Sequence, residues 1–219
     1  MNFRCIPRSG RRCGRRRVAG FTMIEVLITL VVLALGLIGV IGLQARGQQA
    51  ELESYQRGQG LALLQDMVDR INTNRAGAHS LSYVTSSPVG GGGALVSCTG
   101  SGATYDLCEW GNELNGAAES ASGTACDTTS GAGCIGAMLG ARGCVSYDNT
   151  TELTDSKGAA QPGTGIYTVT VAWQGLAPTA APPANLTCGQ NLYPAGATAN
   201  DAYRRVVVAT LRIGDLNSP

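Results

Sequence analysis

A run of 20 residues without a charged side chain, between Glu25 and Arg46, constrains this chain of 219 residues more than any other feature. At about 1.5 Å per residue, a helix of that length spans the roughly 30 Å hydrocarbon core of a bilayer. A buried core helix is the alternative, but such an uninterrupted run is long for one. We therefore predict a membrane-spanning helix near the N-terminus.

Positive charge is concentrated before this run. Seven of the 16 basic residues lie within the first 17 positions, which contain no acidic residue. Only Arg46 and Arg57 closely follow the run, so the positive-inside rule predicts a cytoplasmic N-terminus and an exported remainder. That remainder holds nine basic and 15 acidic residues, a balance that makes nucleic-acid binding an unfavoured function.

Removal by ordinary signal peptidase is an alternative fate for the apolar run. A secretory signal peptide has about 7 to 15 apolar residues followed by a small-x-small cleavage site. The run here is longer, and the best cut, after Ala45, places Leu43 where a small residue is expected. The sequence therefore favours a retained membrane helix.

Glu25 is the one acidic residue near the N-terminal end of this predicted helix. A carboxylate at membrane depth costs about 2.5 to 3.5 kcal/mol on insertion scales, so it usually has a partner or a function. Cleavage between Gly20 and Phe21 would create an α-amino group in the same layer, and pairing between neighbouring subunits would then set the axial register of packed helices. A Glu25 that simply reaches the interface is the alternative.

The stretch RRVAGFTMIEVLITLVVLALGLIGVIGL resembles the signal of type IV prepilins and pseudopilins. The resemblance implies that a prepilin peptidase cuts after Gly20 and N-methylates Phe21, and that Glu25 is needed for assembly into a fibre. Met23 stands where Leu is commonest in the family. What the family implies is a structural subunit that leaves the inner membrane for a growing helix bundle.

The helical pattern continues beyond the apolar run and becomes amphipathic. We predict one helix from Phe21 to about Asn74, ended by the Asn and Gly residues of positions 72–77. Its expected apolar positions are Leu52, Tyr55, Ala62, Leu64, Met67, Val68 and Ile71. Five glycines along it are either close-packing sites between helices or places where the helix stretches or kinks: Gly36, Gly39, Gly42, Gly58 and Gly60.

Two strands and a shorter third are expected in the rest of the chain. Alternation predicts strands over residues 166–173 and 204–213, with a shorter one over 143–147, and a Ser/Gly-rich loop over 86–104. The predicted organisation is a basic leader (1–20), a transmembrane helix (21–45), an amphipathic helix (46–76) and an exported head (77–219). The predicted fold class is α+β, with a long helix packed on a small antiparallel sheet, and the resemblance implies that this fold is pilin-like.

Six cysteines lie in the predicted head, and two more, Cys5 and Cys13, lie in the leader. An even number on the exported side of a membrane indicates up to three disulfides, with 15 possible connectivities. No Cys-x-x-Cys pair occurs among them, so neither a zinc site nor a redox motif is indicated. The candidate disulfide residues are Cys98, Cys108, Cys126, Cys134, Cys144 and Cys188.

Catalytic and ligand-binding signals are weak. His79 is the only histidine, there is no Gly-x-Ser-x-Gly, and the spacing of Asp148, Glu152 and Asp155 fits no standard calcium loop. We expect no catalytic residue, no metal and no cofactor. Three arginines on the last strand could form a basic strip for DNA or lie at the core edge, and both remain open: Arg204, Arg205 and Arg212.

Four further stretches resemble minor pilins of the type IV pilus: GLQARGQQAE, LLQDMVDRINTNR, ATYDLCEW, and YTVTVAWQG followed by RRVVVATLRI. This resemblance implies a priming or tip complex with other minor pilins, the major pilin and an inner-membrane assembly platform as partners. The head would be periplasmic and later lie in the fibre or at its tip on the cell surface. A type II secretion pseudopilin and a membrane-anchored tip adhesin or DNA-binding module are the alternatives.

Overall fold

The computed structural model describes residues 20–91, 95–117, 138–195, 198–199 and 201–214. The chain divides into two compact units, residues 1–47 and 48–219, and the 51-residue helix α1 (Met23–Thr73) contributes to both. In the first unit, α1 begins after Thr22, whose hydroxyl accepts a hydrogen bond from the Glu25 amide at 3.3 Å. This side chain satisfies one of the free amides of the first helical turn.

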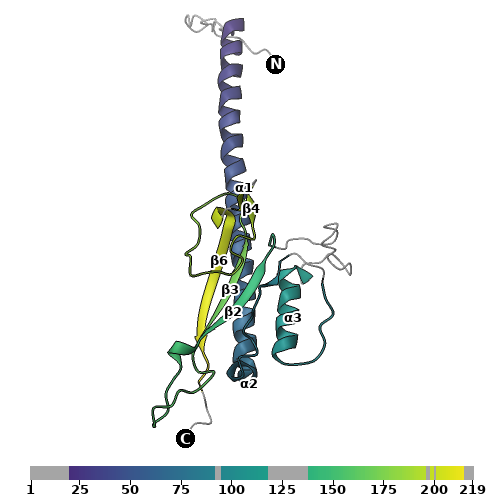
Figure 1. Cartoon of the computed structure of the whole chain (residues 1–219). Coiled ribbons are helices and arrows are strands. Elements are labelled where there is room, and N and C mark those ends of the chain that lie inside the picture. The colour runs from purple at the N-terminus through teal and green to yellow at the C-terminus, as the bar shows by residue number, and fades with distance from the viewer. Residues whose placement is uncertain (1–19, 92–94, 118–137, 196–197, 200, 215–219) are drawn as a thin grey trace, which may run out of the picture. The chain divides into compact units, whose positions relative to one another are not determined.

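The second unit contains a four-stranded antiparallel sheet in the order β1-β2-β3-β6 (Figure 1). The strands are β1 (Val89–Gly90), β2 (Arg142–Asp148), β3 (Ile166–Gln174) and β6 (Arg204–Arg212). The three strands predicted from alternation are confirmed to within one or two residues at each end. A separate two-stranded ribbon consists of β4 (Pro194–Ala195) and β5 (Thr198–Ala199). Among the described connections are the 3-10 helices η2 (Asn149–Thr151) and η3 (Asp201–Tyr203).

One face of this sheet packs against the second half of α1. Tyr167, Val169, Val171 and Trp173 alternate along β3 and are all buried. They meet a stripe on α1 that consists of Gly60, Leu64, Met67 and Ile71. The prediction of an α+β fold with the helix packed on the sheet is confirmed.

The predicted apolar stripe on α1 is too long at its N-terminal end. Leu52 and Tyr55 are about half exposed, at 55% and 56%, and Ala62 is also exposed. The buried positions of the helix begin only at Gly60, where the indole of Trp173 covers it. The expectation for these three residues was therefore wrong.

Helix α3 (Ala103–Leu114) was not expected from the sequence, which indicated a loop up to residue 104. Its Trp110 is fully buried, and the indole N–H donates a hydrogen bond to the Leu63 carbonyl of α1 at 2.9 Å. The ring also lies over Gly143 of β2, where a Cβ would come within 2.3 Å of it. Trp110 therefore ties α3 to both the helix and the sheet.

The end of α1 follows the prediction, with one addition. The helix ends at Thr73, but the chain turns at once into the short helix α2 (Arg75–His79). The Asn74 side chain caps α2 by accepting a hydrogen bond from the Gly77 amide at 3.1 Å.

Candidate functional site

The residues that the sequence singled out for processing lie at the start of α1. Gly20 and Phe21 precede the helix, and Glu25 lies in its first turn. All three are exposed, with 82% of the Phe21 side chain accessible. Among the described residues, none lies within 4 Å of a Cβ built on Gly20.

The first half of α1 has no partner among the described residues of its own chain. Its window of highest hydropathy is long and apolar enough to cross a membrane, and none of that window is buried. Each of the four glycines of this half, Gly36, Gly39, Gly42 and Gly47, would leave its Cβ in open space. The apolar face and the glycines therefore have no packing role inside the described chain. A surface of this kind is suited to contact with lipid or with other helices.

Residues 15–41 match the family model described as the prokaryotic N-terminal methylation motif. No curated protein and no solved structure matches the chain. The methylation motif spans Gly20, Phe21 and Glu25 and supports a member of the type IV pilin or pseudopilin family. It implies processing by prepilin peptidase and assembly with other pilins. Together with the apolar helix, it supports membrane anchoring of a structural subunit rather than an enzyme.

Two disulfides lie among the described residues, Cys98–Cys108 and Cys144–Cys188. The first fastens the segment before α3 to the helix itself. The second holds the segment around Cys188 against the outer sheet face, where it forms a small cluster with Ala172 and Tyr193. The other two candidates, Cys126 and Cys134, lie outside the described residues.

The three arginines of β6 do not form a common basic strip. Arg204 is 1% exposed, and its guanidinium donates to the Leu186 and Cys188 carbonyls at 2.6 and 3.0 Å. Arg205 points to the opposite sheet face, toward α1, and only Arg212 is exposed. Arg204 is therefore a core-edge residue, and the basic strip considered for DNA is interrupted.

The carboxylates considered for calcium serve local turns. Asp148 accepts hydrogen bonds from the amide and hydroxyl of Thr150, and Asp155 accepts from the amides of residues 157 and 159. Glu152 accepts from the Tyr147 hydroxyl at 2.5 Å. Within the described part of the chain, no group of three acidic, Cys or His side chains is placed to hold a metal ion.

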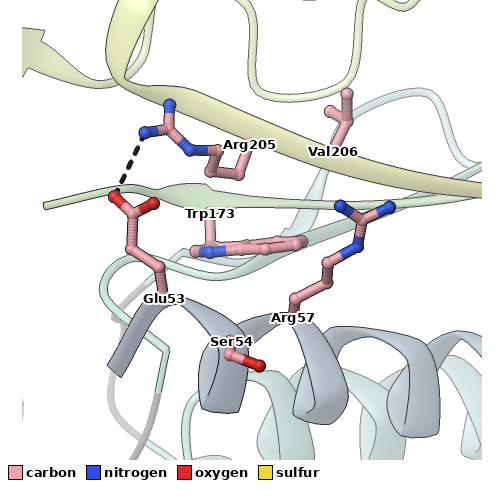
Figure 2. A pocket seen from close by; sticks show the side chains of 6 residues that line it. All are labelled: Glu53, Ser54, Arg57, Trp173, Arg205 and Val206. Carbon is pink, nitrogen blue, oxygen red and sulfur yellow. Dashed lines mark hydrogen bonds and ion pairs between the residues drawn. The ribbon is translucent and has the colours of Figure 1, made fainter. Parts of the chain in front are cut away.

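A hollow of about 360 Å³ lies between α1 and the ends of β3 and β6, and we call it the basic hollow. Figure 2 shows the Trp173 indole between Glu53 and Arg57, with Arg205 reaching Glu53 from the strand above. The Glu53–Arg205 ion pair measures 3.2 Å. The residues that line the basic hollow are Glu53, Ser54, Arg57, Trp173, Arg205 and Val206.

A second hollow, of about 440 Å³, lies on the α3 side of α1, and we call it the acidic hollow. Its one guanidinium, on Arg70, binds Asp66 at 2.6 Å and reaches Glu113 of α3 at 2.8 Å. Asp106 lies 3.9 Å from it and also accepts a hydrogen bond from the Tyr83 hydroxyl. The residues that line the acidic hollow are Asp66, Asp69, Arg70, Thr73, Asn74, Gly102 and Asp106.

Negative charge exceeds positive charge in this cluster. Burial, and then the neighbouring Asp66 carboxylate, raise the pKa of Glu113 to about 7 although Arg70 opposes them. Burial alone would lower the pKa of Arg70, but its hydrogen bond to Asp66 and the surrounding carboxylates outweigh burial and raise it. The two pKa shifts have a common cause, because one guanidinium is shared among several carboxylates. The guanidinium therefore keeps its proton more firmly, and each carboxylate is incompletely neutralised.

Neither hollow was found from the sequence. Asp66, Asp69 and Arg70 read as part of a solvated helix face, and Arg57 as one of the few charges that follow the apolar run. The partners that define the hollows come from distant segments, since Glu53 and Arg205 are 152 positions apart and Arg70 and Glu113 are 43 apart. The excess of acidic residues after residue 17 was the only available signal.

Proposed function

We propose that the chain is a minor pilin of the type IV pilus, of the type called pilus modification protein PilV. It takes part in the priming or tip complex on which the major pilin polymerises, and so in pilus-dependent motility and adhesion. The observation that carries the proposal is the methylation motif at the start of an apolar helix whose surface is free of partners in the described chain.

The proposed processing follows from the residues at that helix start. Prepilin peptidase cuts after Gly20 and methylates the new amine of Phe21. Glu25 then pairs with this amine in a neighbouring subunit, which removes an unpaired charge from an apolar layer and sets the axial register. Residues 1–20 are the leader, 21–45 the transmembrane helix, 46–76 the amphipathic helix and 77–219 the head.

The proposed location is the bacterial inner membrane, crossed once. The seven arginines before the helix favour a cytoplasmic N-terminus and a periplasmic head. Two disulfides in the described head are consistent with an oxidising compartment. The subunit then enters the fibre or its tip, with other minor pilins and the major pilin as neighbours and the inner-membrane assembly platform as the machine that extracts it.

The test is the mass of the N-terminal peptide of the protein purified from the membrane fraction of its own bacterium. An N-methylated Phe21 is the expected result. A Gly20→Leu variant serves as the control and should retain the leader. A start at Met1 in the natural protein would contradict the proposal, and a start near Arg46 would identify a secreted soluble domain instead.

The pilus role has a second test that separates it from a secretion pseudopilus. Fibres sheared from the cell surface are probed for the protein in strains that lack either the pilus assembly platform or the type II secretion platform. Loss only without the pilus platform supports the proposal. Loss only without the secretion platform would show a pseudopilin.

A further inference from the structure

Strand β6 forms one edge of the four-stranded sheet, since the strand order is β1-β2-β3-β6 (Figure 1). Its nine residues pair with β3 without interruption, from Arg204 with Gln174 to Arg212 with Ile166. Natural sheets protect such an edge with charged residues, a proline or a bulge, because unpaired backbone groups bind further strands. The segment 206–211 has the sequence VVVATL, with no charge and no proline, and its continuous register contains no bulge.

The backbone groups that β6 leaves unpaired follow from its register. The Gly175 amide donates to the Tyr203 carbonyl at 2.7 Å, one step beyond the paired residues Gln174 and Arg204. Such bonds recur at every second residue of an antiparallel pair, so the odd-numbered residues of β6 bond to β3. From residue 206 onward, the N–H and C=O groups of the even-numbered residues point away from β3, and no described residue bonds to them: Val206, Val208, Thr210 and Arg212.

The basic hollow opens beside the first part of this edge, between α1 and the β6 residues Arg205 and Val206. Arg205 is committed, because it binds Glu53 at 3.2 Å and donates to two backbone carbonyls. Arg57 is exposed and takes part in none of the ion pairs among the described residues. Figure 2 shows its side chain rising from α1 toward β6 beside the Trp173 ring. The basic hollow therefore offers one available cation next to an apolar ring.

A second available cation lies at the far end of the same edge. Arg212 is exposed and also has no ion pair with a described residue. It lies seven positions after Arg205, or about 23 Å along a strand, and the odd spacing places the two side chains on opposite faces of the sheet. A shallow hollow of about 210 Å³ adjoins it, lined by Ile166, Thr210, Leu211 and Arg212.

The charges at this edge select the kind of chain that can pair with it. Strand β6 contains three arginines and no acidic residue. Pairing with β6 of a second copy would therefore bring like charges together in either strand direction. A strand with a carboxylate near each end would instead meet Arg57 on the α1 face and Arg212 on the outer face.

We propose that an extended acidic segment of another protein adds to β6 as a fifth strand of this sheet, with one carboxylate on Arg57 in the basic hollow and a second on Arg212. Main-chain hydrogen bonds to the free edge supply affinity, and the two arginines supply specificity. This contact involves only the head, so it is independent of the proposed pilus role.

The experiment measures binding of a defined peptide to the full chain in detergent. The probe is the peptide Glu-Thr-Val-Thr-Val-Thr-Val-Glu, labelled with fluorescein at its N-terminus and amidated at its C-terminus, and its fluorescence anisotropy gives the Kd. Its length matches the stretch from Arg205 to Arg212, and its two carboxylates fall on opposite faces of a strand. The same peptide with Gln at both ends should bind at least about fivefold more weakly.

A proline on the edge tests the backbone pairing. Thr210→Pro removes one N–H from the free edge and leaves the bonds to β3 in place, because this amide points away from β3. It should weaken binding of the probe at least about tenfold. Thr210→Val, which keeps the amide and a side chain of the same shape, is the matched control and should bind as the natural chain does. The urea midpoint of each variant shows whether the head remains folded.

Hydrogen exchange of the natural chain gives a second measurement of the backbone pairing that needs no variant. The amides of Val208 and Thr210 face the free edge, so they should exchange more slowly when the probe is bound. The amides of the odd-numbered residues of β6 already bond to β3 and should change little. Unchanged exchange at Val208 and Thr210 with the probe bound would contradict strand addition.

Charge reversal tests the two arginines. Arg57→Glu and Arg212→Glu should each raise the Kd of the probe at least about fivefold. The double variant should prefer the peptide with Lys at both ends, because both charge pairs are then reversed. Arg75→Glu, an exposed charge at the start of α2, is the matched control and should leave the Kd unchanged.

Three results would overturn this contact. The first is a natural chain that does not bind the probe at millimolar concentration, and the second is equal binding by Thr210→Pro and Thr210→Val. The third is a particle of two chains in detergent that becomes a single chain in Thr210→Pro, which would show that a second copy covers the edge. The N-terminal mass of Phe21 is unaffected by any of these results, so the proposed function is tested separately.

Discussion

The two halves of α1 have the same secondary structure and opposite relations to their own chain. From Met23 to Gly47 every side chain is exposed, and the glycines face open space. From Gly60 to Ile71 the helix buries a stripe against the sheet, and a Cβ on Gly60 would lie 3.0 Å from the Trp173 ring. The first half has an apolar surface that only partners outside the chain can cover. The second half is amphipathic, because the sheet of the same chain covers its apolar stripe.

This contrast separates the effects of substitutions in a testable way. Changes in the first half should alter assembly and leave the head as stable as before. Changes in the second half should alter the stability of the head and leave membrane insertion intact. The five predictions below run from the largest expected effect to the smallest.

Glu25→Ala should leave insertion intact and lower the amount of protein in sheared pili by at least about tenfold, because the methylated amine of the neighbouring Phe21 loses its carboxylate in an apolar layer. The measurement is an immunoblot of sheared fibres against the membrane fraction. Glu51→Ala, an exposed acidic residue on the same helix, is the control. Normal recovery of the Glu25 variant would remove the proposed role of that residue.

Trp110→Ala should destabilise the head by about 3 to 5 kcal/mol, since it empties a fully buried site and deletes the hydrogen bond to Leu63. Urea unfolding of the full chain in detergent, followed by the fluorescence of Trp173, measures the effect. Leu33→Ala on the exposed half of α1 should leave the same transition unchanged. Equal urea unfolding transitions for the two variants would contradict the proposed difference between the two halves of α1.

The contrast also marks what the sequence could reveal. The 20-residue run and the period-two alternation over 166–173 each depend on local patterns, and both led to correct elements. Helix α3 follows Gly102, which provides no side-chain cap, and contains Gly111. Trp110 packed over Gly143 and the Cys98–Cys108 disulfide hold it in place, and the first of these contacts joins segments far apart in the sequence.

The same reason explains why the site was only partly foreseen. Gly20, Phe21 and Glu25 form a continuous motif and could be read directly. The hollows arise from pairs such as Glu53 with Arg205, whose partnership exists only after β6 has joined the sheet beside α1. Charge patterns along a helix show which face is polar and do not show which distant residue meets it.

The two disulfides should differ in their contribution to the stability of the head. Cys144 and Cys188 are separated by 44 positions, and Cys98 and Cys108 by 10. The loss of loop entropy in the unfolded chain therefore gives a stabilisation of about 4 kcal/mol for Cys144–Cys188 and about 3 kcal/mol for Cys98–Cys108. Replacing each pair with Ser and measuring the urea midpoint tests the order. A larger decrease of the urea midpoint from replacing Cys98 and Cys108 would contradict this order. It would show that the stability of α3 depends more on its disulfide than the outer sheet face depends on Cys144–Cys188.

The stability of the head should depend on pH through the cluster of acidic residues around Arg70. The pKa of Glu113 rises to about 7 in the folded chain, so the proton is bound more tightly there than in the unfolded chain. The resulting stability is complete below the ordinary pKa of a glutamate and is lost as pH rises through about 7. We expect the head to be about 1 kcal/mol more stable near pH 5.5 than near pH 8, after allowance for solvent screening.

Glu113→Gln should flatten this dependence, because the amide cannot ionise. The other groups of the cluster, Asp66, Asp106 and Tyr83, remain in both proteins, so the difference between the two pH profiles reports the ionisation of Glu113 together with its effect on these neighbours. The measurement is the urea midpoint over that pH range in detergent. Parallel profiles for the two proteins would contradict the assignment.

The smallest effects come from two glycines in the same stretch of α1. A Cβ on Gly58 meets nothing within 4 Å, so Gly58→Ala should stabilise the head by up to about 1 kcal/mol through helix propensity. Gly60→Ala should gain nothing, since its Cβ would press on the Trp173 ring at 3.0 Å. Thermal unfolding of the two variants gives the comparison, and equal midpoints would show that Trp173 yields without cost. If Gly58→Ala raises the midpoint but lowers the yield of protein in sheared pili, Gly58 contributes to assembly, through either close packing between helices or a stretch or kink of α1.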